Sequence, residues 1–292
     1  MPNAVAAPAT HVLEWLAISL TPGLGPTKAR KLVERLGSPE AVFRASLTEL
    51  EGSGIQAVSA QSIATGKSAE LAREELARAA ALGATVICTE DRCYPPRLKE
   101  IYDPPVVLYV RGNSDVLLQP GIAMVGTRHP TPYGSGMAER PGCDLAKQGL
   151  VIISGMARGV DTASHRGAIS ANGKTIAVFG TGIDVIYPKE NSRLSEQILG
   201  LGGAFISEFP IGTFAAPQNF PIRNRILSGM SVGVLVVEAA EYSGTRWNKT
   251  ATFSQSRATL RIRIPGVRTR SSNKAPSWSQ PGKMSGKICR RK

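Results

Sequence analysis

Short apolar runs alternate with polar loops over residues 121–238. The runs are IAMVG, VIISG, TIAVFG, AFISE and VGVLVVEA, and each leads into a loop that holds Gly, Ser, Thr, Arg or Asn. Nearly continuous apolar runs of this length are typical of strands buried on both faces. The pattern predicts an α/β fold built on a parallel sheet, with its ligand-binding face at the carboxyl ends of the strands.

Helical segments fit between these strands at 133–148, 161–171, 192–201 and 221–228. Pro141 lies inside the first of them, where a proline removes a hydrogen bond and crowds the preceding turn. We therefore expect a kink or an interruption at that residue.

The chain before residue 66 is predicted to be a small helical domain. HVLEWLAISL has helical spacing, PGLGP interrupts it, and a second helix follows from Thr27 to Leu36, with Ser38 and Thr48 as N-caps of two more. A helix, PGLGPTKA and another helix resemble a helix-hairpin-helix, whose hairpin offers N–H groups to nucleic-acid phosphate. A plain helical bundle with an ordinary Gly-Pro turn fits the same pattern.

Two further strands are expected before the main run. An alanine-rich helix from residue 66 ends at Leu82-Gly83, and the strands ATVICT and VVLYV follow it. We expect them to lead into the main sheet, so that residues 66–245 form one domain after the helical domain at 1–65.

The net charge of +13 comes from the tail, residues 246–292. That segment carries 13 of the 35 Lys and Arg residues and none of the 22 Asp and Glu residues, so the rest of the chain is neutral. The tail has no helical or strand period, and we predict that it is unstructured. The isoelectric point therefore says nothing about the folded part.

Neither a membrane span nor a secretory signal is evident, so we expect a cytoplasmic protein that does not contact membrane. The four Cys and three His residues lack the spacing of a metal site, and no metal is expected.

Gly126, Thr127 and Arg128 form the first candidate loop, between a strand and a helix. Gly lets a backbone approach a phosphate closely, and Arg pairs with phosphate oxygens at two points. The loop is not G-x-G-x-x-G and no ribose-binding acid follows it, which disfavours a dinucleotide and leaves no cofactor predicted. A simple turn with a solvated arginine is the alternative.

The next two loops add positive charge at the same edge. Ser154, Gly155, Arg158 and Gly159 lie in the sequence SGMARGVD, and Lys189 lies in YPKEN. Ser154 is not in a nucleophile elbow, so nucleophilic catalysis is disfavoured.

Neighbouring residues have structural interpretations. Asp161 is expected to cap the following helix and His165 to be a surface or capping residue. Lys189 fits a phosphate contact or a solvated turn equally well.

The densest polar cluster is QNFPIRNR, which gathers amides and arginines around one aromatic ring. Single-stranded nucleic acid is held by charge on its backbone and by stacking on its bases, and this composition suits both. The alternative is a helix that begins near Pro221, with its arginines in internal ion pairs. The candidate residues are Asn219, Phe220, Arg223, Asn224 and Arg225.

The motifs that carry a family resemblance are VGTRHPTPYG, SGMARGVDTASHRGA, FGTGIDVIYPKEN, SEFPIGT, PQNFPIRNRILSG and VVEAAEYSGT. Over about residues 10–245 the sequence resembles the DNA-processing protein A (Smf) family. The resemblance implies an extended Rossmann-like domain behind a helical, SAM-like or helix-hairpin-helix domain. It also implies single-stranded DNA binding, homodimers, and loading of a RecA-type recombinase during natural transformation. It implies no chemical step. It places Gly126, Thr127 and Arg128 in the phosphate-binding signature, and Gly155, Arg158, Lys189, Asn219, Phe220 and Arg223 in the same pocket or its rim.

An enzyme is the alternative function, because phosphoribohydrolases that cut nucleotides share this Rossmann subclass. They need a PGGxGT loop and a nearby catalytic Glu. The comparable segment here is EAAEYSGT, with Glu238 and Glu241 but no double glycine.

After Thr245 the sequence departs from the family pattern. The tail can be back-translated into DNA whose shifted frame includes NTLIKQGAKLV, part of the continuation expected for the family. We therefore hypothesise a frameshift near Arg246, which resequencing of the locus tests. A natural basic arm is the alternative.

Overall fold

The computed structural model describes residues 11–238 and 259–261. The predicted domain boundary near residue 65 stays a prediction. The tail from residue 246, the frameshift hypothesis and Glu241 lie outside the described residues, with the exception of a three-residue strand at Thr259–Arg261.

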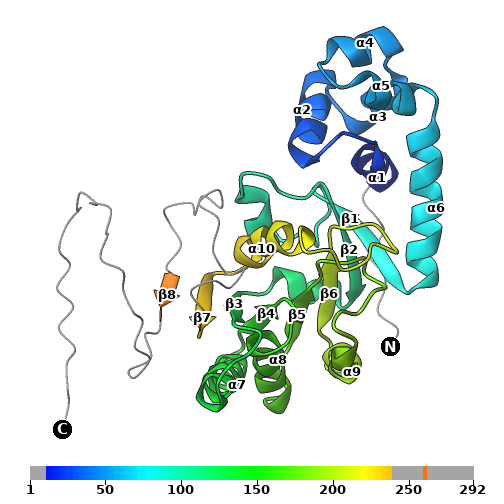
Figure 1. Ribbon diagram of the computed structural model, residues 1–292. Helices are drawn as coiled ribbons and strands as arrows, with labels where there is room; N and C mark the ends of the chain where they lie inside the picture. The colour runs from blue at the N-terminus through cyan, green and yellow to red at the C-terminus, as the bar shows by residue number, and fades with distance from the viewer. Residues whose placement is uncertain (1–10, 239–258, 262–292) are drawn as a thin grey trace, which may run out of the picture. The chain divides into compact units, whose positions relative to one another are not determined.

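Within the described residues, six helices precede the sheet, and the first five are short (Figure 1). They are α1 (Val12–Leu20), α2 (Pro26–Leu36), α3 (Pro39–Arg44), α4 (Leu47–Gly52), α5 (Ala57–Ala64) and α6 (Lys67–Ala81). Apolar residues of these helices share one core with residues of β1 and β2.

Of the two predicted helix caps, Ser38 is confirmed and Thr48 is wrong. The Ser38 hydroxyl accepts a hydrogen bond from the Ala41 N–H, at the start of α3. Thr48 lies inside α4, whose N-cap is Ser46. Ser46 and Glu49 form a reciprocal capping box, in which each side chain bonds the other residue's backbone N–H. Ser46 is the N-cap because it lies three residues before Glu49, a spacing that lets the two side chains satisfy two backbone N–H groups.

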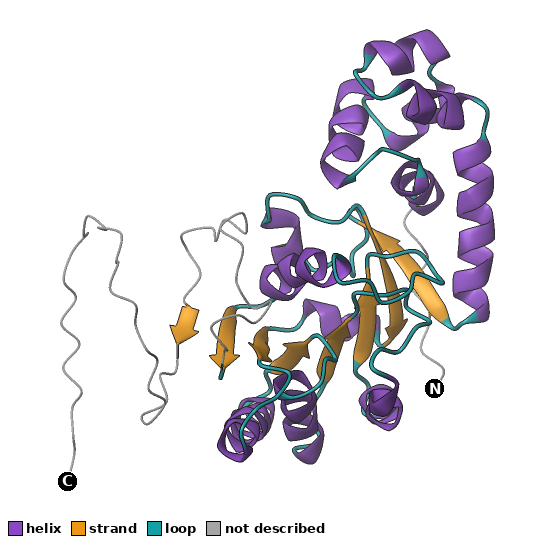
Figure 2. Ribbon diagram, viewed as in Figure 1, coloured by secondary structure: helices purple, strands orange, loops and turns teal. Residues whose placement is uncertain are grey.

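All seven predicted strands form and belong to one mixed sheet (Figure 2). The order is β1-β2-β6-β5-β4-β3-β7-β8, and all pairs from β6 to β8 are parallel. The bounds are β1 (Ala84–Cys88), β2 (Val107–Gly112), β3 (Gly121–Gly126), β4 (Val151–Ser154), β5 (Thr175–Val178), β6 (Ala204–Ser207), β7 (Gly233–Val237) and β8 (Thr259–Arg261).

The sheet differs from a purely parallel one at one side, where β1 and β2 form an antiparallel pair and β2 pairs antiparallel with β6. Two 3-10 turns, η1 (Pro96–Glu100) and η2 (Ser114–Leu118), flank β2 in the chain. At the other side of the sheet, β8 pairs with β7. The strand β8 lies in the tail, which was predicted to be unstructured.

Helices cover both faces of the parallel strands (Figure 1). The helices α7 (Pro132–Lys147) and α8 (Val160–Ser170) pack on the face that Met124 and Ile152 present. The helix α10 (Asn219–Met230) packs on the opposite face, and α9 (Ser192–Gly200) follows a 3-10 turn, η3 (Lys189–Asn191). Because strand side chains alternate between faces, both helix layers find an apolar surface on the same strands.

The helix α7 runs through Pro141 without interruption, so the predicted break does not occur. The close approach of α7 and α8 accounts for this. A Cβ on Gly142 would lie 2.8 Å from the Ser164 carbonyl oxygen, and one on Gly167 would overlap the Glu139 carbonyl oxygen. Tertiary packing thus holds a helix that proline weakens locally.

Candidate nucleic-acid interface

The carboxyl ends of the parallel strands bring the predicted loops together at one edge of the sheet. Strands β3, β4 and β5 are neighbours there, and β7 lies beside β3. The loop after β3 is joined to the start of α8 by a backbone hydrogen bond, and the Arg223 side chain of α10 reaches the ends of β4 and β5. The edge is the place where an open α/β sheet binds its ligand.

The loop after β3 is fixed by its backbone and presents Arg128 to solvent. The Thr127 N–H donates to the Glu238 carbonyl oxygen over 3.1 Å, and the Thr127 carbonyl accepts from Val160 N–H over 3.1 Å. A Cβ on Gly126 would overlap the Val237 carbonyl oxygen. Glycine is therefore required at residue 126 so that β3 and β7 can stay paired up to their ends.

Phe220 links Arg128 to a second aromatic ring. The Arg128 guanidinium carbon lies 5.3 Å from the centre of the Phe220 ring, in cation–π range. The Tyr187 ring centre is 5.9 Å from that of Phe220. A Cβ on Gly180 would lie 2.8 Å from Phe220 Cδ1, so this glycine lets the ring settle on the loop after β5. Charge and aromatic surface meet at one place.

Arg223 lies beneath these loops rather than at their surface, with 5% of its area exposed. Its Nη1 donates to the carbonyl oxygens of Gly155, over 2.7 Å, and Val178. Burial lowers the pKa of Arg223, while Asp161 raises it. The guanidinium ties α10 to the loop after β4 and to the last residue of β5, and a Cβ on Gly155 would overlap it.

The buried Asp161 side chain fixes the loop after β4 by hydrogen bonds to its backbone. Its carboxylate accepts from the Gly155 and Ala157 N–H groups over 3.1 and 3.3 Å. Burial raises the pKa of this carboxyl, and Arg223 and the loop N–H groups act against that rise. The prediction that Asp161 caps α8 is wrong, because the N-cap is Gly159, at a φ of 77°. A Cβ on Gly159 would overlap the Thr127 carbonyl oxygen.

The other arginine of the QNFPIRNR cluster is engaged internally. Arg225 Nε donates to Asp103 over 2.9 Å, and Nη2 contacts Glu208. Burial raises the pKa of Glu208. The helix starts at Asn219 with Pro221 in its first turn, as the structural alternative had it. Asn224 accepts from Arg223 Nε over 3.3 Å.

The remaining predicted residues divide by burial. Ser154 is fully buried and donates to the Met124 carbonyl over 2.7 Å. Asn219 is buried and its amide donates to the Phe214 carbonyl over 3.5 Å. Among the predicted site residues, the exposed cations that can reach a ligand are Arg128, Arg158 and Lys189.

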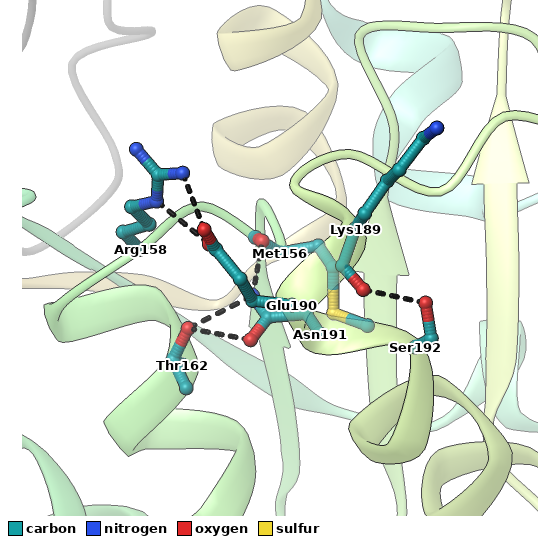
Figure 3. A network of polar contacts seen from close by, with 7 residues as sticks. All are labelled: Met156, Arg158, Thr162, Lys189, Glu190, Asn191 and Ser192. Carbon is teal, nitrogen blue, oxygen red and sulfur yellow. Dashed lines mark hydrogen bonds and ion pairs between the residues drawn. The ribbon is translucent and has the colours of Figure 1, made fainter.

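Arg158 and Lys189 lie close to a shared polar network (Figure 3). Asn191 donates through its amide to the Met156 carbonyl over 2.9 Å and to the Thr162 hydroxyl over 3.0 Å. It thereby ties η3 to the loop after β4. Arg158 pairs with Glu190, while the Lys189 side chain points away from that pair (Figure 3).

Sequence reasoning missed two exposed aromatic residues at this edge. Tyr187 is 46% exposed and lies within the GIDVIYPKEN motif, so its place before Lys189 was an available signal. Phe214 is 73% exposed in the loop between β6 and α10, and nothing in its sequence context marks it. It differs from an ordinary exposed residue because its loop is held in place: Ile211, Gly212 and Thr213 each make a long-range backbone hydrogen bond.

His165 is fully buried, so its assignment as a surface or capping residue is wrong. The hydroxyl of Thr175 donates its proton to the Ile152 carbonyl over 2.6 Å, so it accepts from His165 Nδ1 over 2.7 Å. Burial lowers the pKa of His165 to about 3. The residue is a neutral packing element of α8.

One group of possible metal ligands occurs in the described residues, in the helical segment. Ligand atoms of His11, Glu14 and Glu40 lie within 4.8 Å of one another. His11 Nδ1 contacts the Glu40 carboxylate directly, between the starts of α1 and α3. These residues are not among those at the strand edge.

Glu238, a candidate catalytic residue in the enzymatic alternative, follows β7 and makes a hydrogen bond near the start of α7. Its carboxylate accepts from the Thr131 N–H over 2.9 Å, beside the first turn of α7, where a Cβ on Gly134 would overlap it. A carboxylate there stabilises the positive end of the helix dipole.

The fold and this edge define a class: a Rossmann-like α/β protein whose strand-end loops suit a phosphate-bearing ligand. The model of the family described as DNA recombination-mediator protein A matches residues 85–278, which extends past Thr245. The chain belongs to this family. Among the described helices, none has both the length and the apolar character needed to cross a bilayer.

Known relatives agree with the assignment. Protein Smf of Synechocystis is 38% identical over 237 residues, covering 79% of this chain and 59% of that protein. DNA processing protein A of Streptococcus pneumoniae, a solved structure, has 32% identity and a TM-score of 0.72, with 88% of each chain covered. The Helicobacter pylori protein, solved for its single-stranded DNA binding mode, has 31% identity and a TM-score of 0.50, with 56% of this chain and 72% of that chain covered. This chain spans about half to three fifths of the length of its curated relatives.

Proposed function

We propose that this protein binds single-stranded DNA at the carboxyl edge of its sheet, without catalysing a reaction, and delivers it to a RecA-type recombinase. In this proposal it acts in the cytoplasm as a homodimer during natural transformation. The family's description as a recombination mediator and the DNA-binding relative from Helicobacter pylori support it.

The observation that carries the proposal is the Arg128 guanidinium over the Phe220 ring. Single-stranded DNA offers a phosphate and an unpaired base at each step. A cation beside a partly exposed ring can meet both, with little sequence preference. Arg158 and Lys189 extend the positive charge along the edge, and Tyr187 extends the aromatic surface.

The predicted residues that are buried or half-buried take positioning roles in this proposal. Ser154, Gly155, Gly159, Asn219 and Arg223 set the shape of the loops. Gly126 and Thr127 present Arg128, Asn224 orients Arg223, and Arg225 anchors α10. The DNA itself meets the exposed side chains.

The test is fluorescence anisotropy of a labelled thymine oligonucleotide, titrated with the full chain over a salt series. We expect the logarithm of affinity to fall with the logarithm of salt at a slope of about −2, which corresponds to three phosphate contacts on a single strand. A duplex of the same length should bind more weakly. Equal affinity for duplex would contradict the proposal.

The basic tail requires its own control, because 13 Lys and Arg residues bind any polyanion. A synthetic peptide of residues 246–292 serves this purpose. If the peptide alone reproduces the affinity and the salt slope of the full chain, the strand edge is not the binding site. Recombinase loading is measured separately, as faster strand exchange on DNA that is coated with single-strand binding protein.

We further expect Phe214→Ala to weaken single-stranded DNA binding about fivefold or more, because stacking on one base is typically worth about 1–3 kcal/mol. The rigid loop makes Phe214 a preformed platform at the edge. Phe214→Tyr should keep the wild-type affinity, whereas Phe214→Leu should behave like the alanine variant. An apolar contact without stacking would instead leave the leucine variant unchanged.

A further inference from the structure

Arg158 and Glu190 form an ion pair with two hydrogen bonds at the strand edge. Arg158 Nε lies 2.8 Å from one carboxylate oxygen of Glu190, and Nη2 lies 2.6 Å from the other. This is the two-point geometry in which a guanidinium binds carboxylate or phosphate most strongly. Both side chains are nevertheless more than half exposed, at 57% and 64%.

Both ends of this pair are held in place before any ligand arrives. Asn191, next to Glu190, bonds the Met156 carbonyl and the Thr162 hydroxyl. Thr162 in turn donates to the Ala157 carbonyl over 2.8 Å, next to Arg158. Because the two backbones are tied together, the pair loses little conformational freedom when it forms, and it keeps its register (Figure 3).

Glu190 changes the charge that the edge presents. Its pKa is lowered by the hydrogen bonds from Arg158, so it is ionised at neutral pH and cancels the charge of one exposed cation. A carboxylate and a phosphate need the same two donors of the guanidinium. An anion approaching Arg158 therefore meets both an occupied donor pair and a like charge.

Resting on the proposed function, we infer that Glu190 limits the affinity of the strand edge for single-stranded DNA by occupying Arg158 in the free protein. A backbone phosphate of the bound strand takes the place of the carboxylate. The exchange is feasible because an exposed ion pair contributes little stability in water. The residue keeps binding weak enough for the strand to be passed on.

The test is Glu190→Gln, which keeps the size and polarity of the side chain and removes its charge. We expect the variant to bind a thymine oligonucleotide about three- to fivefold more tightly at low salt, the size of one nearby charge in water. The gain should shrink as salt rises, because salt screens exposed charges. Thermal unfolding should be unchanged, since the pair is exposed.

Asp144→Asn is the matched control. Asp144 is paired with Arg140 on the exposed side of α7, at 3.9 Å, three residues before that helix ends. The substitution removes the same charge from another exposed arginine–carboxylate pair, at the far end of a helix that starts at the strand edge. A gain equal to that of Glu190→Gln would assign the effect to net charge and overturn the inference.

Arg128→Ala separates this inference from the proposed function. If Arg128→Ala weakens binding and Glu190→Gln binds as the wild type does, the inference is wrong and the proposed site stands. If neither substitution changes the affinity, both the inference and the proposed site are wrong. A tighter Glu190→Gln variant alongside a weaker Arg128→Ala variant supports both.

Discussion

Arg128→Ala is expected to weaken single-stranded DNA binding by about ten- to a hundredfold, or about 1.4 to 2.8 kcal/mol. The substitution removes a phosphate contact and also the cation that stacks on Phe220, 5.3 Å from its ring centre. The side chain is exposed, so the free energy of unfolding should change by less than about 0.5 kcal/mol. Anisotropy titration and urea unfolding measure the two quantities on the same sample.

Two further variants make the result specific. Arg128→Lys keeps the charge but loses the planar group, so it should fall between wild type and alanine. Arg140→Ala removes an exposed arginine, 86% accessible, from α7 and should bind as the wild type does. Equal losses for Arg128→Ala and Arg140→Ala would show that only net charge matters and would refute a site at the strand edge.

Arg223→Met is expected to lower the free energy of unfolding by about 3–5 kcal/mol, the usual result of leaving one partner of a buried charge uncompensated. The substitution leaves the carbonyl oxygens of Gly155 and Val178 without their donor and leaves Asp161 buried without a nearby cation. Urea unfolding followed by circular dichroism measures the loss. Arg166→Met, an exposed arginine on α8, should change the value by less than about 0.5 kcal/mol.

The loss should depend on pH with a defined sign. Burial already raises the pKa of Asp161, and removal of Arg223 raises it further. A raised native pKa means that stability is lost as pH increases through that value, so the deficit of Arg223→Met should be smaller near pH 4 than near pH 7. Adding Asp161→Asn to Arg223→Met should recover part of the stability at pH 7. No recovery would show that the carbonyl contacts alone account for the loss.

The strands were predictable because each is a nearly continuous apolar run, and burial on both faces leaves few other interpretations. The run IAMVG, for example, supplies Ala123 and Val125 to the core under α10 and Met124 to the core under α7 and α8. The antiparallel pairing of β2 with β6 could not be predicted in the same way. It joins segments almost a hundred residues apart, and the letters of either strand do not specify a partner.

The candidate site was predictable as a set of loops but not as a surface. An arginine in a loop is usually solvated, so Arg128, Arg158 and Arg223 look alike in the sequence. Arg223 is buried because oxygens from residues 155, 161 and 178 surround one point in space. Glu190 neutralises Arg158 across 32 residues of chain. Such pairings depend on tertiary structure, and no local pattern records them.

The glycines at the ends of the strands have a practical consequence for mutational scans. Gly126, Gly155 and Gly159 each lie where a single added carbon would overlap a neighbour. A scan scored by cellular abundance would therefore rank these positions as the most sensitive and report the exposed Arg128 as tolerant. A scan scored by DNA capture would make both groups sensitive. The difference between the two scores, position by position, would separate residues that build the edge from residues that touch the strand.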